Sequence, residues 1–215
     1  MTTQNRIINP APPNLPLGTD TYERRYQDQF TNVLRLYFNQ LQNALTEITG
    51  NAGGRYLAFP YGAFSDFTDQ TATVNTATLM TLDTTDFSNG VSVVSNSKIT
   101  VEYAGIYNLQ FSVQLQNLDN APQDVFIWLK QNGTDITGST GLVGLPARKS
   151  AGVPFHDIKG WNYFLSLNAN DYVQIYWSTT SVDVTIQTYP ASGTPTKPST
   201  ASVVATLSFV SALPT

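Results

Sequence analysis

The sequence predicts a mainly β protein, a jelly-roll sandwich preceded by an extended N-terminal arm and one amphipathic, coiled-coil-like helix. Three observations predict this order. Prolines are dense before Gly18, hydrophobic residues recur at steps of three and four between residues 19 and 50, and short Thr- and Val-rich runs separated by turn residues fill the remainder. These features divide the chain into an arm (1–18), a helix (19–50), a Gly-rich linker (51–54) and a head (55–215).

The arm places four prolines among aliphatic side chains. Proline at this density disfavours both a helix and a central strand, so we expect the arm to be extended. One interpretation is a disordered tail. The other is a docking peptide, because aliphatic side chains on a stiff strand lose little entropy on binding. In the second interpretation the docking residues are Ile7, Ile8, Pro10, Pro12, Pro13, Leu15 and Leu17.

Residues 19–50 have the pattern of an amphipathic helix. Asp20 and Glu23 have the spacing of a capping box, and Gly50 is placed to end the helix. Between them lies a heptad seam, a spacing typical of associating helices. The seam consists of Phe30, Leu34, Tyr37, Leu41, Ala44 and Ile48, and Phe38 and Leu45 widen it. Either the helix packs on its own domain or it forms the stalk of a trimer, which the Gly-rich separation from the head favours.

The head has the density of short strands that is typical of a sandwich or jelly roll. The clearer predicted strands are Lys98–Val101, Ile106–Leu115, Val125–Lys130, Tyr163–Leu167, Tyr172–Trp177, Val182–Thr188 and Ser202–Val210. Weaker strand patterns lie within Arg55–Phe64, Thr73–Leu82 and Gly90–Val94. The segment Ala191–Thr200 is rich in Pro, Ser and Thr and is expected to be an exposed loop.

Alternation within the strands predicts which side chains enter the core. The inward rows are Tyr107, Leu109, Phe111, Val113 and Leu115, then Val125, Ile127 and Leu129, then Val173, Ile175 and Trp177. Five aromatic residues are predicted to point outward: Phe126, Trp128, Phe164, Tyr172 and Tyr176. Together they would form an apolar patch of a size that is rare on monomers. Loops of the same chain could cover them; the preferred interpretation is that they form the trimer interface.

Composition excludes several classes of function. The 215 residues include 11 Lys and Arg against 15 Asp and Glu, so the chain lacks the basic excess that nucleic-acid binding requires. It has no cysteine and one histidine, which removes disulfides, thiolate zinc sites and most histidine-based catalysts. No run reaches the roughly 18 apolar residues of a membrane-spanning helix, and the N-terminus lacks the pattern of a secretory signal. We expect no cofactor, no nucleic-acid partner and no membrane insertion.

The lone histidine, His156, stands before Asp157 in a segment bounded by Gly and Pro. A catalytic role would need a nucleophile, and neither Ser139 nor Ser150 has the surrounding pattern of a nucleophile elbow. We therefore expect a loop histidine and no catalytic residues.

Three pairs of carboxylates, Asp66/Asp69, Asp83/Asp86 and Asp119/Asp124, fall in turn-rich regions. None has the dense acidic loop that would supply the six to eight oxygens of a calcium site, so no metal site is predicted. Asn132–Gly133–Thr134 matches a glycosylation sequon, but Asn-Gly between strands first predicts a type I′ turn.

Four segments of the head, in their order and spacing, resemble the trimeric jelly roll shared by the complement globular head and the tumour-necrosis-factor family. They are ITVEYAGIYNLQFSV (Ile99–Val113), VFIWLKQNGT (Val125–Thr134), LSLNANDYVQIYW (Leu165–Trp177) and SVVATLSFVSAL (Ser202–Leu213). Asn170 stands where that family usually has Gly, and no collagen-like stalk precedes the head. The resemblance implies a three-fold assembly with interface aromatics on the face where Phe126, Trp128, Tyr172 and Tyr176 project.

The order of arm, helix and head, with NPAPPNLPLG followed by YERRYQDQFTNVLRLYFNQLQNAL, is similar to small virion proteins of bacteriophages. This similarity implies a homotrimeric, non-enzymatic appendage, a capsid decoration or a neck or tail fibre, made in the host cytoplasm and located on the particle surface. The arm would dock onto other virion proteins. The head would face outward, where segments Gly138–Gly160 and Thr179–Thr200 could touch a host-surface glycan or protein. The alternative is a free carbohydrate-binding or glycan-cleaving jelly roll, in which surface Tyr and Trp stack on sugar rings.

Overall fold

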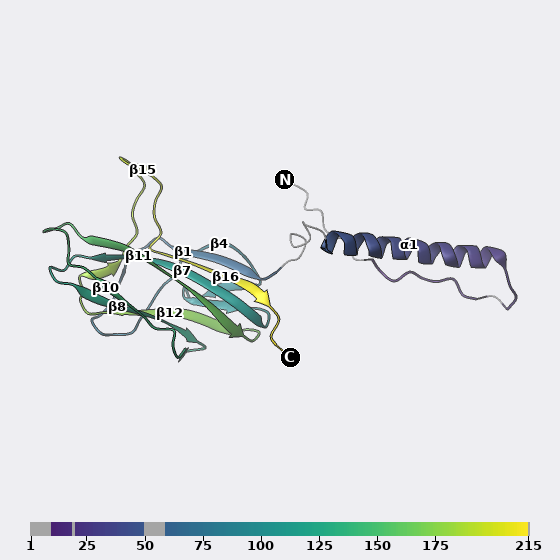
Figure 1. Ribbon diagram of the computed structural model, residues 1–215, viewed down its shortest axis with the longest axis horizontal. Coiled ribbons are helices and arrows are strands. Elements are labelled where there is room, and N and C mark those ends of the chain that lie inside the picture. Colours follow the sequence, from purple (N-terminus) through teal and green to yellow (C-terminus); the bar gives the residue numbers. More distant parts are fainter. Residues whose placement is uncertain (1–9, 19, 50–58, 215) are drawn as a thin grey trace. The chain divides into compact units, whose positions relative to one another are not determined.

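The computed structural model describes residues 10–18, 20–49 and 59–214 (Figure 1). It divides the chain into two compact units, Met1–Ala58 and Phe59–Thr215. The first contains the arm and one helix, and the second is a β-sandwich, so the predicted fold class is confirmed. Ile7, Ile8, Gly50 and the linker 51–54 lie outside the described residues.

The helix α1 spans Arg24–Thr49, 26 residues. It begins later than the predicted Asp20, because the first helical bond runs from the Gln27 N–H to the Glu23 carbonyl (3.1 Å). Glu23 therefore occupies the cap position, and the expected capping box at Asp20 is wrong. No residue of α1 is buried, and over the described residues no helix combines the length and apolar character needed to cross a membrane.

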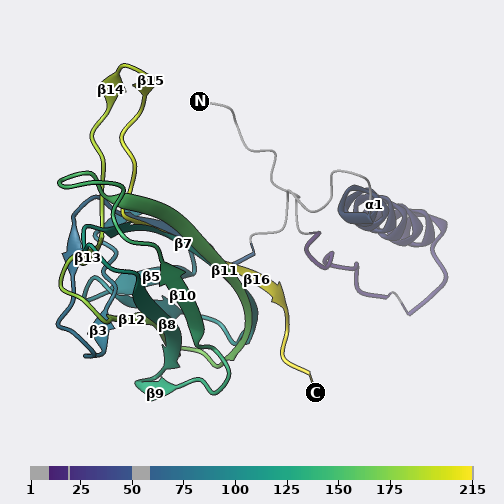
Figure 2. The same cartoon turned by 60° about the vertical axis from the view of Figure 1, so that its left-hand side comes forward.

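Two seven-stranded antiparallel sheets form the sandwich (Figures 1 and 2). Sheet A contains β1 (Tyr61–Asp66), β2 (Gln70–Thr71), β4 (Thr84–Asn89), β7 (Gly105–Asn117), β11 (Phe155–Leu167), β13 (Val184–Ile186) and β16 (Val203–Ser211). Sheet B contains β3 (Thr78–Leu79), β5 (Val91–Val94), β6 (Lys98–Val101), β8 (Gln123–Gln131), β9 (Thr134–Asp135), β10 (Gly141–Leu145) and β12 (Tyr172–Thr179). A hairpin of β14 (Ser192–Gly193) and β15 (Thr196–Lys197) projects from the sandwich.

The longer strands pair in the nested order of a jelly roll. Strand β1 pairs with β16, β6 with β12, β7 with β11, and β8 with β10, so the first strand of this set meets the last and each inner pair lies within the one outside it. Within sheet A, β7 is central: β11 pairs with its full length, and β16 and β13 share its other edge.

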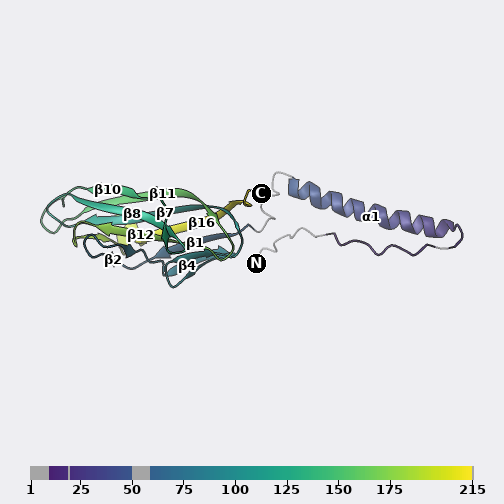
Figure 3. The ribbon, with the colours of Figure 1, turned by 90° about the horizontal axis from the view of Figure 1, so that it is seen from below.

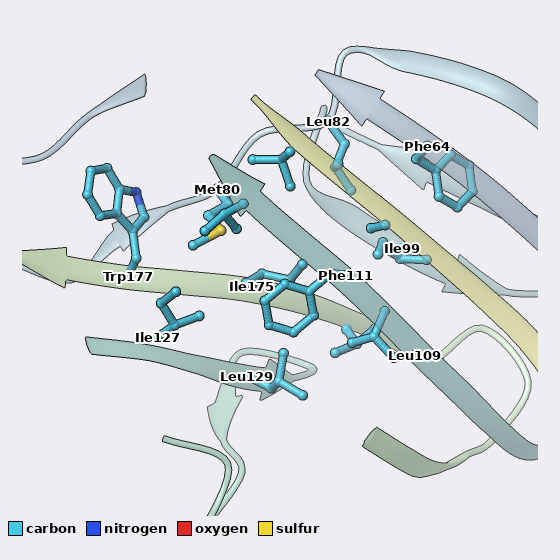
Figure 4. Close-up of a cluster of buried hydrophobic side chains, with 14 of the residues drawn as sticks. Phe64, Met80, Leu82, Ile99, Leu109, Phe111, Ile127, Leu129, Ile175 and Trp177 are labelled. Atoms are coloured by element: carbon cyan, nitrogen blue, oxygen red, sulfur yellow. The ribbon is translucent and has the colours of Figure 1, made fainter. Parts of the chain in front are cut away.

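The core lies between the two sheets (Figure 4). All three predicted inward rows are buried there, from β7, β8 and β12, and Trp177 is completely enclosed. Trp161 of β11 extends this core at the side where β11 and β10 meet: its ring stacks on Phe111 (centroids 5.6 Å apart) and occupies the space where a side chain at Gly141 would lie. Alternation therefore predicted the core side chains correctly.

The turns explain two residues that the sequence singled out. Asn132 and Gly133 both have positive φ (51° and 82°), which confirms the predicted type I′ turn between β8 and β9. Asn170 also has positive φ (67°), so Asn takes a conformation there that usually favours Gly.

Several boundaries differ from the sequence expectations. Strands β4 and β10 and the first half of β11 were not predicted, because TTDFSN, GLVGL and FHDIKG contain Asp or Gly residues that are typical of turns. The segment Gly138–Gly160 is therefore not a distal loop, since it contains β10 and part of β11. In the other direction, Thr73–Leu82 contributes only β3, and Val182–Thr188 only β13.

Leu207 and Ser208 provide a test of the strand faces, because these neighbours on β16 point to opposite sides. Leu207 is fully buried and Ser208 is exposed. Replacing Leu207 with Ala should cost about 2–5 kcal/mol of unfolding free energy, because it leaves a cavity between the sheets. Ser208→Ala should change it by less than about 0.5 kcal/mol. Urea denaturation measures both; equal losses would contradict this placement of β16.

Candidate interaction surfaces

Four of the five aromatic residues predicted to point outward lie together on the outer face of sheet B. Phe126 and Trp128 project from β8, and Tyr172 and Tyr176 from β12; all four are half-buried. Trp128 and Tyr176 are directly opposite each other across the two strands, with ring centroids 5.9 Å apart. The prediction that these side chains leave the core is confirmed.

Long cationic side chains cover these rings. The Lys130 Nζ lies 4.6 Å from the centre of the Tyr176 ring, and the Lys98 Nζ lies 4.7 Å from that of Tyr172. The Trp128 indole N–H donates to Asp135 (2.8 Å), which also pairs with Lys130 (3.4 Å). Such cation–π and ion-pair contacts let aromatic rings lie beside water. The outer face of sheet B therefore already has partners from its own chain for these groups.

Phe164, the fifth aromatic residue, is not part of this surface. It projects from the outer face of sheet A, on the opposite side of the sandwich, and is 62% exposed. The expectation of one continuous patch of five aromatic residues is therefore wrong. Alternation along a strand gives the side that faces the core, but it does not give the sheet to which the strand belongs.

The outer face of sheet A has a different chemistry, because it is almost free of charge across β11, β7 and β16. Its outward side chains are amides, hydroxyls and apolar groups, and His156 at one end is the sole ionisable one among the outward side chains of these three strands. The outward residues are His156, Ile158, Gly160, Asn162, Phe164 and Ser166 of β11, Ile106, Asn108, Gln110, Ser112, Gln114 and Gln116 of β7, and Val204, Thr206, Ser208 and Val210 of β16.

Hydrophobic side chains concentrate where β7 begins. Five adjacent strands each contribute one outward apolar residue there: Phe164 of β11, Ile106 of β7, Val210 of β16, Tyr61 of β1 and Phe87 of β4. Phe87 and Phe164 are 63% and 62% exposed, and the Tyr61 and Phe87 rings contact each other with centroids 6.0 Å apart. This apolar row spans five strands but is interrupted, because Asn108 and Ser208 lie directly across from Phe164 on β7 and β16.

A shallow depression lies beside the apolar row. Gly160 has no side chain, and its cross-strand neighbours Ser112 and Val204 are small, so the face is hollowed at this level. Gln110, Asn162 and Thr206 form its polar side. The depression is open and uncharged, and its shape suits a protein surface better than an ionic ligand.

Strand β11 also forms an edge of sheet A. Its 13 residues pair with β7 along one side, and no other strand of residues 59–214 pairs with it. It contains no proline, and its two charged side chains, Lys159 and Asp157, neutralise each other at 2.8 Å. Its backbone edge is therefore open to pairing along Gly160–Leu167, where the strand carries neither a charge nor a proline.

The arm lies beside α1 within the N-terminal unit (Figures 1 and 3). The Tyr26 hydroxyl donates to the Pro16 carbonyl (3.3 Å). Half-buried residues recur every third position in the arm, at Pro10, Pro13 and Pro16, while Pro12, Leu15 and Leu17 are exposed. The predicted docking residues from Pro10 to Leu17 therefore divide into a half-buried row, on the side of the arm whose Pro16 contacts the helix, and a row turned outward.

The predicted seam of α1 is half-buried through most of its length. Phe30, Leu34, Tyr37, Leu41 and Ala44 are all half-buried, whereas Ile48 is 38% exposed. Phe38 and Leu45, which widen the seam on one side, are 57% and 52% exposed. The sequence reasoning found the seam but not its intramolecular neighbour, the arm.

His156 contacts Tyr189 and not the serines considered with it. Its Nδ1 lies 2.8 Å from the Tyr189 hydroxyl, and the two rings meet edge to face. The Ser139 hydroxyl is buried and donates to the Ile136 carbonyl (2.8 Å). Burial, and to a lesser degree the charge of Lys149, lower the pKa of His156.

The predicted carboxylate pairs serve turns. Asp66 is buried and accepts from the Thr68 N–H and the Thr81 hydroxyl, while Asp69 accepts from the Thr188 N–H. Asp119 accepts from the Ser181 hydroxyl (2.7 Å) and from the Ala121 N–H, and these bonds hold its pKa below the ordinary value. Among the residues the structure describes, no three His, Asp or Glu side chains gather as metal ligands would.

Compared with protein-family models and with curated proteins, the sequence matches none.

The single histidine permits a direct test of this geometry. We expect the His156 imidazole to titrate below its ordinary pKa of about 6.5, since partial burial disfavours the cation. Because the unfolded chain then binds the proton more readily, the contribution of this group to stability is full above pH 6.5 and falls as the pH drops below that value. Lys149→Ala should raise the pKa only in part, because burial is the larger cause.

Proton NMR resolves this one imidazole without assignment ambiguity, since the chain has no other histidine. Titration at or above pH 6.5 in the folded protein would contradict the partial burial of the His156 imidazole.

Proposed function

We propose that this protein is a non-enzymatic structural component that assembles through the outer face of sheet A, as a trimeric appendage of a bacteriophage particle. The arm docks onto the particle and the sandwich is displayed. The number of copies and the setting come from the resemblances of the head and of the arm–helix–head order. The observation that carries self-association is the uncharged outer face of sheet A.

Three properties of that face favour a protein partner. Depletion of charged residues distinguishes the centre of an interface from ordinary surface. The apolar row from Phe164 to Phe87 supplies exposed hydrophobic side chains on neighbouring strands. The edge of β11 borders the same face and carries neither a charge nor a proline over Gly160–Leu167. A second copy of the chain presents the same uncharged chemistry, so its approach separates no charge from water.

This proposal moves the interface from sheet B to sheet A. Of the five aromatic residues expected at the interface, Phe164 is the one that lies on sheet A. The Trp128, Tyr172 and Tyr176 rings have contacts with Asp135, Lys98 and Lys130. The same contacts reduce the support for sugar stacking, because a glycan would have to displace the lysines from the ring faces.

Docking by the arm is supported by its outward row. Leu15 and Leu17 are 45% and 92% exposed on a backbone that proline holds extended. An extended segment with alternate apolar side chains binds with little loss of entropy. For contact with a host surface, the segment Thr179–Thr200 remains of the two that were expected, because it contains the projecting β14–β15 hairpin.

A charge placed at the centre of sheet A tests the interface. Gln110 is exposed on β7 between Asn162 and Thr206, so Gln110→Lys should leave the fold intact and place an unpaired charge in the interface of the assembly. We expect at least a tenfold weaker association by sedimentation velocity, because covering an unpaired charge costs several kcal/mol.

The matched control is Ser178→Lys, which adds the same charge to the outer face of sheet B. It should leave the sedimentation coefficient unchanged. If Ser178→Lys dissociates the assembly and Gln110→Lys does not, the interface lies on sheet B. A single-chain species for the unmodified protein at all concentrations would refute the assembly itself.

Removal of Met1–Gly18 tests docking separately. The shortened chain should still assemble, because sheet A is untouched, but it should be lost from particles in which the full chain is incorporated. Mass spectrometry of purified particles measures both chains side by side. The double substitution Leu15→Ser with Leu17→Ser should reduce incorporation through the outward row alone. Normal incorporation of the shortened chain would contradict a docking role for the arm.

A further inference from the structure

The arm covers the centre of the apolar stripe on α1. The stripe is wide, because Leu34, Phe38 and Leu45 extend it to one side of the line through Phe30, Tyr37 and Ile48. Residues along its middle are half-buried, and none is fully buried. The Tyr26 hydroxyl donates to the Pro16 carbonyl (3.3 Å), and prolines are half-buried at every third position of the arm, so the arm supplies part of this cover along the first turns of α1.

The two segments have compatible repeats. A polyproline II strand returns the same face every three residues, about 9 Å along its axis, while a heptad of α-helix advances about 10.5 Å. One proline therefore falls near each heptad of the seam. From Pro16 to Pro10 the arm advances about 19 Å, which equals about 12 helical residues, so the described arm extends from Tyr26 to the neighbourhood of Phe38.

The seam extends farther than the described arm. Ile48 and Leu45 remain exposed in the last turns of α1, where Glu47 is the only charged residue. Alternating steps of four and three are the repeat that helices use to pack on one another, and an arm of polyproline II type does not require them. The seam can therefore pack against two partners, the arm and another helix, and the single chain supplies only the arm.

The two partners need the same surface. In a bundle of parallel helices, Phe30, Leu34, Tyr37 and Leu41 would face the other copies, and the first three lie within the stretch of α1 that the described arm spans. We propose that the seam of α1 is occupied by the arm in the single chain and by the helices of neighbouring copies in the assembly, so that assembly releases the arm. This inference rests on the proposed self-association and adds an order of events to it.

Release changes what the arm presents. In the single chain, Pro10, Pro13 and Pro16 face the helix and only the outward row is free. In the assembly both rows are available for docking, on every copy at once, which raises the effective concentration of arms at a particle. The contact between the arm and α1 in the single chain therefore favours docking of assembled protein over docking of single chains.

The test uses the full chain with a single reporter. Because the chain has no native cysteine, Ile48→Cys carries one pyrene label, at a seam position beyond the described arm. The test variant adds Pro13→Ser and Pro16→Ser, which weaken the inward row. The control variant adds Pro12→Ser and Leu15→Ser. These substitutions alter the outward row at the positions directly before Pro13 and Pro16. Excimer emission reports helix–helix contact, and sedimentation equilibrium reports the mass.

We expect the test variant to show excimer emission at about tenfold lower chain concentration than the unsubstituted and control chains. Equal emission from all three, or weaker emission from the test variant, would overturn the competition between arm and helices. Assembly by mass without excimer emission in any chain would overturn it as well, while leaving the proposed sheet A interface intact. A single-chain mass throughout would overturn both proposals.

Discussion

The alternation of side chains along β7 is the constraint on which the head depends. Its odd-numbered residues from Tyr107 to Leu115 are buried between the sheets, and its even-numbered residues from Asn108 to Gln116 are polar and uncharged. Because β11 pairs with β7 from end to end, and β16 and β13 share the other edge, neighbouring strands take their register from it. A slip of one residue would exchange the core row with the surface row. One register therefore fixes both the hydrophobic core and the outer face of sheet A.

The two outer faces satisfy their exposed groups in different ways. On sheet B, Lys98 and Lys130 lie across tyrosine rings, and Asp135 accepts from the Trp128 indole, so the chain supplies these contacts itself. On sheet A the amide and hydroxyl rows have no such charged cover, and Phe87 and Phe164 remain more than half exposed. A face without charge loses less hydration free energy than a charged face when another protein covers it and its amides and hydroxyls gain hydrogen-bond partners there, which is the physical basis for placing self-association on sheet A.

The sequence was sufficient for properties that depend on one strand at a time. Alternation identified the buried rows of β7, β8 and β12, and the Asn132–Gly133 pair identified its turn. It was insufficient where the answer depends on which strands become neighbours. Phe164 has the same local pattern as Trp128, but β11 pairs with β7 and β8 pairs with β12, so the two rings lie on opposite faces. Strands β4 and β10 were missed because Asp and Gly lower their strand propensity, which pairing with β1 and β8 overrides.

The N-terminal unit shows the same dependence on partners in a simpler form. A 26-residue helix with no buried side chain gains little from tertiary packing, and helices in water owe most of their stability to such packing. The arm provides part of it through a row of prolines whose spacing, about 9 Å, is close to but shorter than the heptad spacing of about 10.5 Å. The mismatch grows with each repeat, so an arm of this kind can cover a few turns of helix but cannot follow a seam to its end. A second helix has the same repeat as the first and has no such limit. The contact between the arm and the seam within one chain is therefore shorter than the contact that a second helix could make with the same seam.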